Sequence, residues 1–263
     1  MVSVICGSCV TSGCSQRRHY KSAWLVSRSD VARYVEQATH ADSADARREA
    51  IVQLTKTRYA DDDIVIEAYR QIAREDPNEI VRCVAVRALS QSSHEDVVAA
   101  LIDLVGPNVA NESDGPTDRV RADILRGLEQ LATQDRLTQD QMDASASIAV
   151  RSLRNQSNRD VQVASVILLG RLPRRASLDA LIGTLNHPDY GVVYHARRSL
   201  EALTGQVFDD DPAAWRAWLS ATESPFEHRG QWMPSEGSQK TWWQRSAEKI
   251  RGAFTGTGTE RGN

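Results

Sequence analysis

The sequence predicts an all-α protein, a right-handed α-solenoid of about five helical hairpins. Apolar residues recur at helical spacing along most of the chain, polar turns separate the apolar segments, and one segment repeats. The copies are spaced by 35, 39, 41 and 31 residues, measured between Ala46, Val81, Val120, Val161 and Val192. One hairpin cannot bury its apolar face alone, whereas a stack of hairpins can.

The clearest copies of the repeated segment are Asp76–Leu89 and His187–Leu200. From Val81, apolar residues fall at i, i+3, i+4, i+7 and i+8, which is the pattern of a helix face rather than a strand. Pro77 suits the first turn of a helix. The first helix of each hairpin is expected at Asp45–Leu54, Asp76–Leu89, Asp118–Leu128, Arg159–Leu169 and His187–Leu200. The second helix is expected at Asp62–Arg74, His94–Val105, Thr138–Leu153, Arg174–Leu185 and Pro212–Leu219.

The last predicted hairpin carries extra features. Gly205 follows an apolar helical segment and suits the left-handed backbone that ends a helix. Trp215 and Trp218 lie three residues apart in the next predicted helix. We interpret the two tryptophans as a cover over the open end of the apolar core.

Composition and motifs argue against several classes of function. The chain has 263 residues and a formal net charge of −3, from 32 Lys and Arg against 35 Asp and Glu. This balance disfavours a nucleic-acid partner, because neutralisation of phosphates dominates the affinity of DNA binders. No apolar run approaches the roughly 20 residues that span a bilayer. The sequence shows no phosphate-binding glycine loop, metal-ligand pair or nucleophile elbow, so we predict no enzyme, cofactor or metal site.

The segment Asp76–Leu89, which reads Asp-Pro-x-x-x-Val-Arg-x-x-Ala-x-x-Ala-Leu, resembles the HEAT repeat. The resemblance covers residues 42–220, about two-thirds of the chain. It implies a stacked helical surface, so we expect a non-catalytic scaffold that binds one or more protein partners. Some proteins similar to HEAT repeats are bilin lyases or DNA glycosylases. The alternatives are therefore a lyase-like enzyme on the same fold and, third, a nucleic-acid binder.

Residues 1–41 are interpreted as a signal or tether and a leading helix. Val2–Val10 is apolar or small, and small residues precede Cys14. This pattern resembles the cleavage box of bacterial lipoproteins, which implies a lipid on Cys14 and a location in the bacterial cell envelope. No Lys or Arg precedes the apolar stretch, and Thr11 stands where the box has a larger aliphatic residue. The alternative is an unprocessed terminus and a cytoplasmic protein.

Two groups of side chains are candidates for an interaction surface. The first is a basic row at equivalent positions of three copies, formed by Arg47, Arg82 and Arg121. Gln162 and Val193 interrupt this row in the last two copies, and the alternative is that the arginines are solvated or cap helices. The second group is Tyr190 and Tyr194, one helical turn apart, which we expect to line a small groove.

The composition of the chain changes after the repeats. Residues 221–239 are rich in Pro, Gly, Ser and charge and are interpreted as a linker. Residues 240–254 combine helical apolar spacing with four basic residues against one Glu, which predicts a basic amphipathic helix. This helix suits a membrane surface or a groove on a protein partner. Its contact residues are expected to be Trp242, Trp243, Ile250 and Phe254. Residues 255–263 are expected to be disordered.

Overall fold

The computed structural model describes residues 26–106 and 115–231. All regular structure within these two ranges is helical, which confirms the predicted all-α class. Each helix of the predicted hairpins has its counterpart, and α1 is the leading helix. The helices are α1 (Arg28–His40), α2 (Ala44–Leu54), α3 (Asp63–Glu75), α4 (Glu79–Gln91), α5 (Val97–Val105), α6 (Asp118–Thr133), α7 (Gln139–Asn155), α8 (Arg159–Leu169), α9 (Arg175–Thr184), α10 (Tyr190–Thr204) and α11 (Pro212–Ala221).

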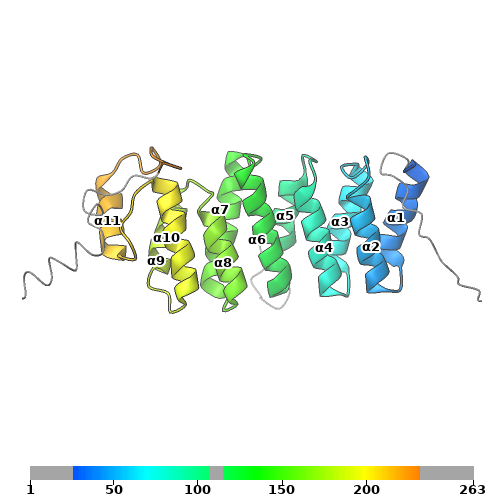
Figure 1. The fold of residues 1–263 in the computed structure, drawn as a ribbon, viewed down its shortest axis with the longest axis horizontal. Coiled ribbons are helices and arrows are strands. Elements are labelled where there is room, and N and C mark those ends of the chain that lie inside the picture. Colours follow the sequence, from blue (N-terminus) through cyan, green and yellow to red (C-terminus); the bar gives the residue numbers. More distant parts are fainter. Residues whose placement is uncertain (1–25, 107–114, 232–263) are drawn as a thin grey trace, which may run out of the picture.

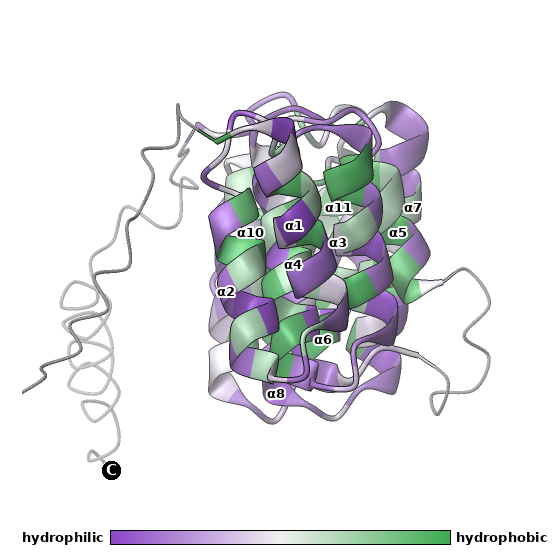
Figure 2. Ribbon diagram, turned by 90° about the vertical axis from the view of Figure 1, so that its right-hand side faces the viewer, coloured by the Kyte–Doolittle hydropathy of each residue, from purple (hydrophilic) through white to green (hydrophobic). Residues whose placement is uncertain are grey.

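The helices lie in a row that follows the order of the chain (Figure 1). The even-numbered helices from α2 to α10 contact one another in succession, and so do the odd-numbered helices from α1 to α11. Figure 2 looks along the row and shows α2 and α10 on one side and α5 and α7 on the other. Every substantial contact among the described helices joins neighbours or next neighbours along the chain. This packing is compatible with a helical repeat.

The pairing of helices within the row is shifted by one helix from the predicted pairing. We expected the helix at Asp76–Leu89 to pair with the helix that follows it. Instead α4 packs more extensively on the preceding α3, and α8 and α10 likewise pack more on α7 and α9. Only residues 76–78 connect α3 to α4, whereas residues 55–62 connect α2 to α3. This short connection holds α3 and α4 antiparallel against each other. The helices α5 and α6 pack as a close pair although residues 106–117 connect them, so each close pair begins with an odd-numbered helix even where its connection is long.

One connected core of buried side chains runs through the row, from Val26 to Leu219. The valines that mark the repeat are all buried, at Val81, Val120, Val161 and Val192. Ala46 is exposed, and it belongs to α2, which is the first helix of its layer. The core therefore follows the repeated apolar positions and links each helix pair to the next.

The end of the row is closed by aromatic side chains. Trp215 is fully buried, and its indole Nε1 donates a hydrogen bond of 3.1 Å to the carbonyl of Asp209. The ring of Phe208 lies edge-on to Trp215 with 4.9 Å between ring centroids, and Trp218 is partly buried beside them. The hydrogen bond satisfies the one polar atom of the buried indole. These contacts support the interpretation of the tryptophans as a cover for the core.

The described part of the predicted linker lies against α10. Gly205 ends α10 with a φ of 71°, the left-handed conformation expected there. The backbone N–H of Gly230 donates to the carbonyl of Ala202 over 3.0 Å, and Arg229 donates to the carbonyl of Arg171 over 3.0 Å. A Cβ at Gly205 would lie 2.7 Å from the carbonyl oxygen of His228, so only glycine fits this crossing.

Candidate interaction surfaces

The predicted basic row is not an exposed surface. Arg47 and Arg121 are buried, and Arg82 is half-buried. The side chains of all three arginines turn back toward the connection that precedes their own helix. The prediction that they form an exposed basic interaction surface is therefore wrong, because a guanidinium held in the protein is not available to a partner.

Two of these arginines, Arg47 and Arg82, cap the ends of odd-numbered helices. Each donates to the carbonyl of the residue that follows the preceding odd-numbered helix, where backbone carbonyls lack partners within the helix. Gln162, which we expected to interrupt the row, makes the same bond. Arg121 instead donates to a carbonyl in the connection directly before its own helix. The four bonds are Arg47 Nη1 to Ala41 (2.7 Å), Arg82 Nη1 to Asp76 (2.6 Å), Arg121 Nη2 to Pro116 (3.4 Å) and Gln162 Nε2 to Gln156 (2.9 Å). At Arg47, Arg82 and Gln162, the side-chain N–H donors therefore link the two helices of a pair.

Tyr190 and Tyr194 are exposed on α10, with 68% and 42% of each residue accessible. The ring of His195 lies edge-on to the Tyr194 ring at 5.4 Å between centroids. The guanidinium carbon of Arg197 lies 5.8 Å from the centre of the Tyr194 ring. Tyr194 is thus held by its neighbours while one part of its ring faces solvent.

The repeat explains why Tyr194 is exposed. The alignment of the repeated segments makes Tyr194 equivalent to Cys83 of α4. Cys83 is buried and interacts with Asp123 of α6, the next helix in the even-numbered layer. Among the described helices, α10 is the last of that layer. The face of α10 that would meet a further helix therefore carries Tyr194.

Cys83 is a structural residue. Burial, followed by the nearby carboxylate of Asp123, raises the pKa of its thiol to about 11. A thiol with this pKa carries little thiolate at neutral pH and is a poor nucleophile. Asp123 is itself buried and pairs with Arg87 at 2.8 Å and Arg126 at 3.0 Å. Cys83 and Arg87 of α4 thus contact Asp123 of α6, and these contacts link the two helices without providing a reactive thiol.

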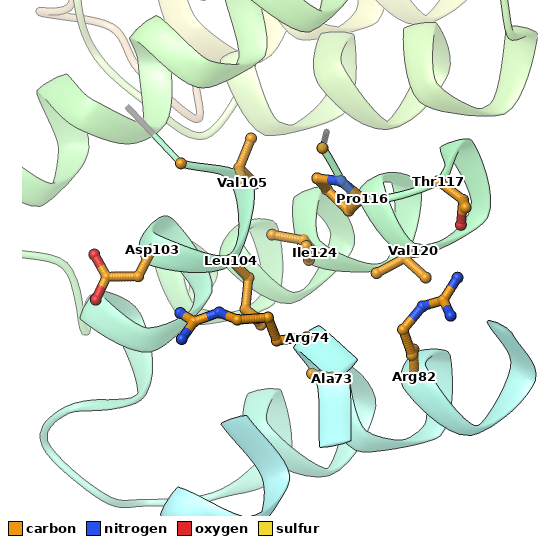
Figure 3. A pocket seen from close by; sticks show the side chains of 12 residues that line it. Ala73, Arg74, Arg82, Asp103, Leu104, Val105, Pro116, Thr117, Val120 and Ile124 are labelled. Atoms are coloured by element: carbon orange, nitrogen blue, oxygen red, sulfur yellow. The ribbon is translucent and has the colours of Figure 1, made fainter. Parts of the chain in front are cut away.

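A cavity of about 300 Å³ lies where α3, α4, α5 and α6 meet. Figure 3 shows Arg74 and Arg82 at separate places along one wall, with Val120 and Ile124 on the wall opposite. The lining also includes Gly106 and Gly115, the residues on either side of residues 107–114. Arg82 is engaged with the carbonyl of Asp76. In a small-molecule site, a few polar groups converge on the ligand. The polar groups of this cavity do not converge on one point.

The remaining predicted contact residues lie outside the described part of the chain. They are Cys14, Trp242, Trp243, Ile250 and Phe254. Within residues 26–106 and 115–231, no group of His, Cys, Asp and Glu is arranged to hold a metal ion. No helix in the same ranges is both long and apolar enough to cross a bilayer.

Comparisons with known proteins give a structural likeness. No family model matches the sequence, and no curated protein matches it. The crystal structure of an engineered protein, a structural genomics target, is similar at 17% sequence identity and a TM-score of 0.48. That similarity covers 85% of this chain and 97% of the engineered chain.

Proposed function

We propose that this chain is a non-catalytic, protein-binding scaffold of the HEAT-repeat type. In this proposal the row is a right-handed α-solenoid of about five HEAT-like repeats, and its outer side chains bind protein partners. The contacts between successive helices and the repeated segment at Asp76–Leu89 support it. A stack of this kind presents one long surface whose binding does not depend on a catalytic residue.

The observation that carries the proposal is the exposed tyrosine pair on α10. Tyr190 and Tyr194 lie one turn apart on the outermost described helix of their layer. Tyrosine is enriched at protein interfaces, because it combines a large apolar ring with a hydroxyl and loses little conformational entropy on binding. A partner that packs on α10 would occupy the position that a further helix of the stack would take. It would cover both tyrosine rings.

We further propose that the scaffold is held at a bacterial envelope membrane through a lipid on Cys14. A single acyl chain holds a membrane weakly, so a second contact is needed for stable anchoring. Residues 240–254 have the basic amphipathic pattern that suits this second contact. Mass spectrometry of the protein from its own cells tests the anchor: an acylated Cys14 as first residue supports it, and an intact Met1 contradicts it.

Affinity capture with quantitative mass spectrometry tests the scaffold. The full chain serves as bait, next to the double variant Tyr190→Ala/Tyr194→Ala. We expect at least one protein to be enriched by the unchanged chain and to be lost by about tenfold or more in the double variant, as for residues at the centre of an interface.

The matched control is Ile64→Ala/Ile80→Ala, which removes two other exposed apolar side chains, 60% and 44% accessible, from α3 and α4. It should capture the same protein as the unchanged chain. Equal loss in both double variants, or no protein enriched by the unchanged chain, would contradict the role of the tyrosine pair.

A further inference from the structure

We propose that a groove along α7 and the start of α9 binds an acidic segment of a partner protein. This inference rests on the proposed scaffold function and names the chemistry of one partner. The groove has a volume of about 520 Å³. Its lining comes from α7 and from residues 174–176. The groove lies on the odd-numbered layer, away from the tyrosine pair of α10.

The groove is strongly basic in a chain whose net charge is −3. Among the described residues, four arginines line it against a single carboxylate, that of Asp143. This carboxylate is already paired with Arg174. The four arginines are Arg151, Arg154, Arg174 and Arg175. The positive end of the α9 helix dipole adds to their field, because α9 begins at Arg175.

Two of the arginines are fixed and two are available. Arg174 donates to the carbonyl of Gln139 over 3.0 Å, and Arg151 donates to the carbonyl of Gly106 over 3.2 Å. Arg154 is exposed and makes no ion pair with another described residue. Arg175 has a 57% accessible side chain and lies 4.0 Å from a carboxylate of its own helix. A carboxylate of a partner can therefore reach Arg154 and Arg175 at little cost to the fold.

The shape of the groove favours an extended or helical peptide. Its lining on α7 falls on one stripe of the helix, at Asp143, Ser147, Val150 and Arg154. At a rise of 1.5 Å per residue, this stripe is about 16 Å long. Val150 and Ala176 add apolar surface beside the charges. The apolar surface suits the side chains of a peptide that carries both acidic and apolar residues.

A nucleic acid fits these features less well. Binders of nucleic acids neutralise many phosphates over a wide surface, whereas the arginines of this groove lie on α7 and the start of α9 alone. The arginines thus match a few carboxylates, each held by charge-assisted hydrogen bonds.

Fluorescence anisotropy on the full chain tests the inference. The probes are a short labelled peptide of Glu and Leu, the same peptide with Gln in place of Glu, and a labelled single-stranded oligothymidine. We expect the Glu peptide to bind at least tenfold more tightly than the other two probes. The double variant Arg154→Glu/Arg175→Glu should weaken its binding by about tenfold or more, since it reverses two charges that face the ligand.

The matched control is Arg119→Glu/Arg216→Glu, which changes the net charge equally at two exposed positions on α6 and α11. It should bind the Glu peptide as the unchanged chain does. Equal weakening by both double variants, or tighter binding of oligothymidine than of the Glu peptide, would overturn the inference. If Arg154→Glu/Arg175→Glu retains every protein that the unchanged chain captures, the inference would also be overturned while the scaffold function stands. Absence of any captured protein would instead count against the scaffold itself.

Discussion

Arg47 and Asp76 form a buried ion pair with two hydrogen bonds. Arg47 Nε donates to Asp76 Oδ2 over 2.7 Å, and Nη2 donates to Oδ1 over 3.0 Å. The side chains are 9% and 4% accessible. The hydrogen bonds to Asp76 raise the pKa of Arg47 above its ordinary value. Since Arg47 lies on α2 and Asp76 follows α3, this pair joins one helix pair of the row to the next.

Asp76→Ala is expected to lower the free energy of unfolding by about 3 kcal/mol, because it leaves the Arg47 charge buried without its partner. Urea denaturation followed by circular dichroism measures this change. The control is Asp45→Ala, which removes an exposed pair with Arg48 and should cost less than about 1 kcal/mol. Equal losses from the two substitutions would show that the Arg47–Asp76 pair contributes no more to stability than an exposed ion pair.

Gly170→Ala is expected to destabilise the protein by about 1 to 3 kcal/mol through overpacking. An added Cβ would lie 2.6 Å from the Cβ of Ser199 and 3.0 Å from its Cα, so backbone of α10 has to move. Gly183→Ala on α9 is the matched control, because nothing lies within 4 Å of its added Cβ. Alanine in that helix should stabilise by about 0.5 to 1 kcal/mol. Thermal unfolding of both variants decides the point, and the two shifts in melting temperature should have opposite signs.

Trp215→Ala is expected to cost about 3 to 5 kcal/mol, the usual range for a fully buried tryptophan. It opens the end of the core and removes the ring contact with Phe208. Trp218→Ala should cost clearly less, because Trp218 is only partly buried. Urea denaturation of the two variants compares them directly, and a larger loss from Trp218→Ala would contradict this account of the chain end.

Stability is expected to fall as pH rises from about 9 to about 11 because of Cys83. Its pKa is 9.0 in ordinary surroundings and about 11 in the fold, where burial is the largest cause. In this window the unfolded chain loses the thiol proton first and binds fewer protons than the folded protein, so the free energy of unfolding decreases. Tyr69 acts in the same direction, since burial raises its pKa. Cys83→Ala should reduce the alkaline loss in urea titrations, and an unchanged pH dependence would refute this assignment.

The helices were predictable because the spacing of apolar residues on one helix is a local property. The pairing of helices was not predictable from the repeated segments. The apolar positions of a segment such as Asp76–Leu89 do not show whether its helix packs on the preceding or on the following helix. For α3 and α4 the length of the connection is informative, because residues 76–78 are too few to let α4 leave α3. It is not a general signal, because α5 and α6 pack as a pair although residues 106–117 connect them.

The surfaces were harder to predict than the helices. Arg47 and Arg82 hold equivalent positions in the repeat, but the direction of a long side chain depends on acceptors that only the fold brings near. Gln162 at the same position was the available signal, because it shares N–H donors with arginine and lacks the charge. The α7–α9 groove was missed because Arg154 and Arg174 belong to different helices, which the packing of the odd-numbered layer places side by side.

Contacts restricted to near neighbours give this chain a low contact order. Folding rates rise as contact order falls, since little chain entropy is lost before each contact forms. Each helix pair finds its partners among the residues that leave the ribosome next to it. The nascent chain is therefore expected to gain structure progressively from α1 onward, with α11 and Trp215 sealing the growing end last.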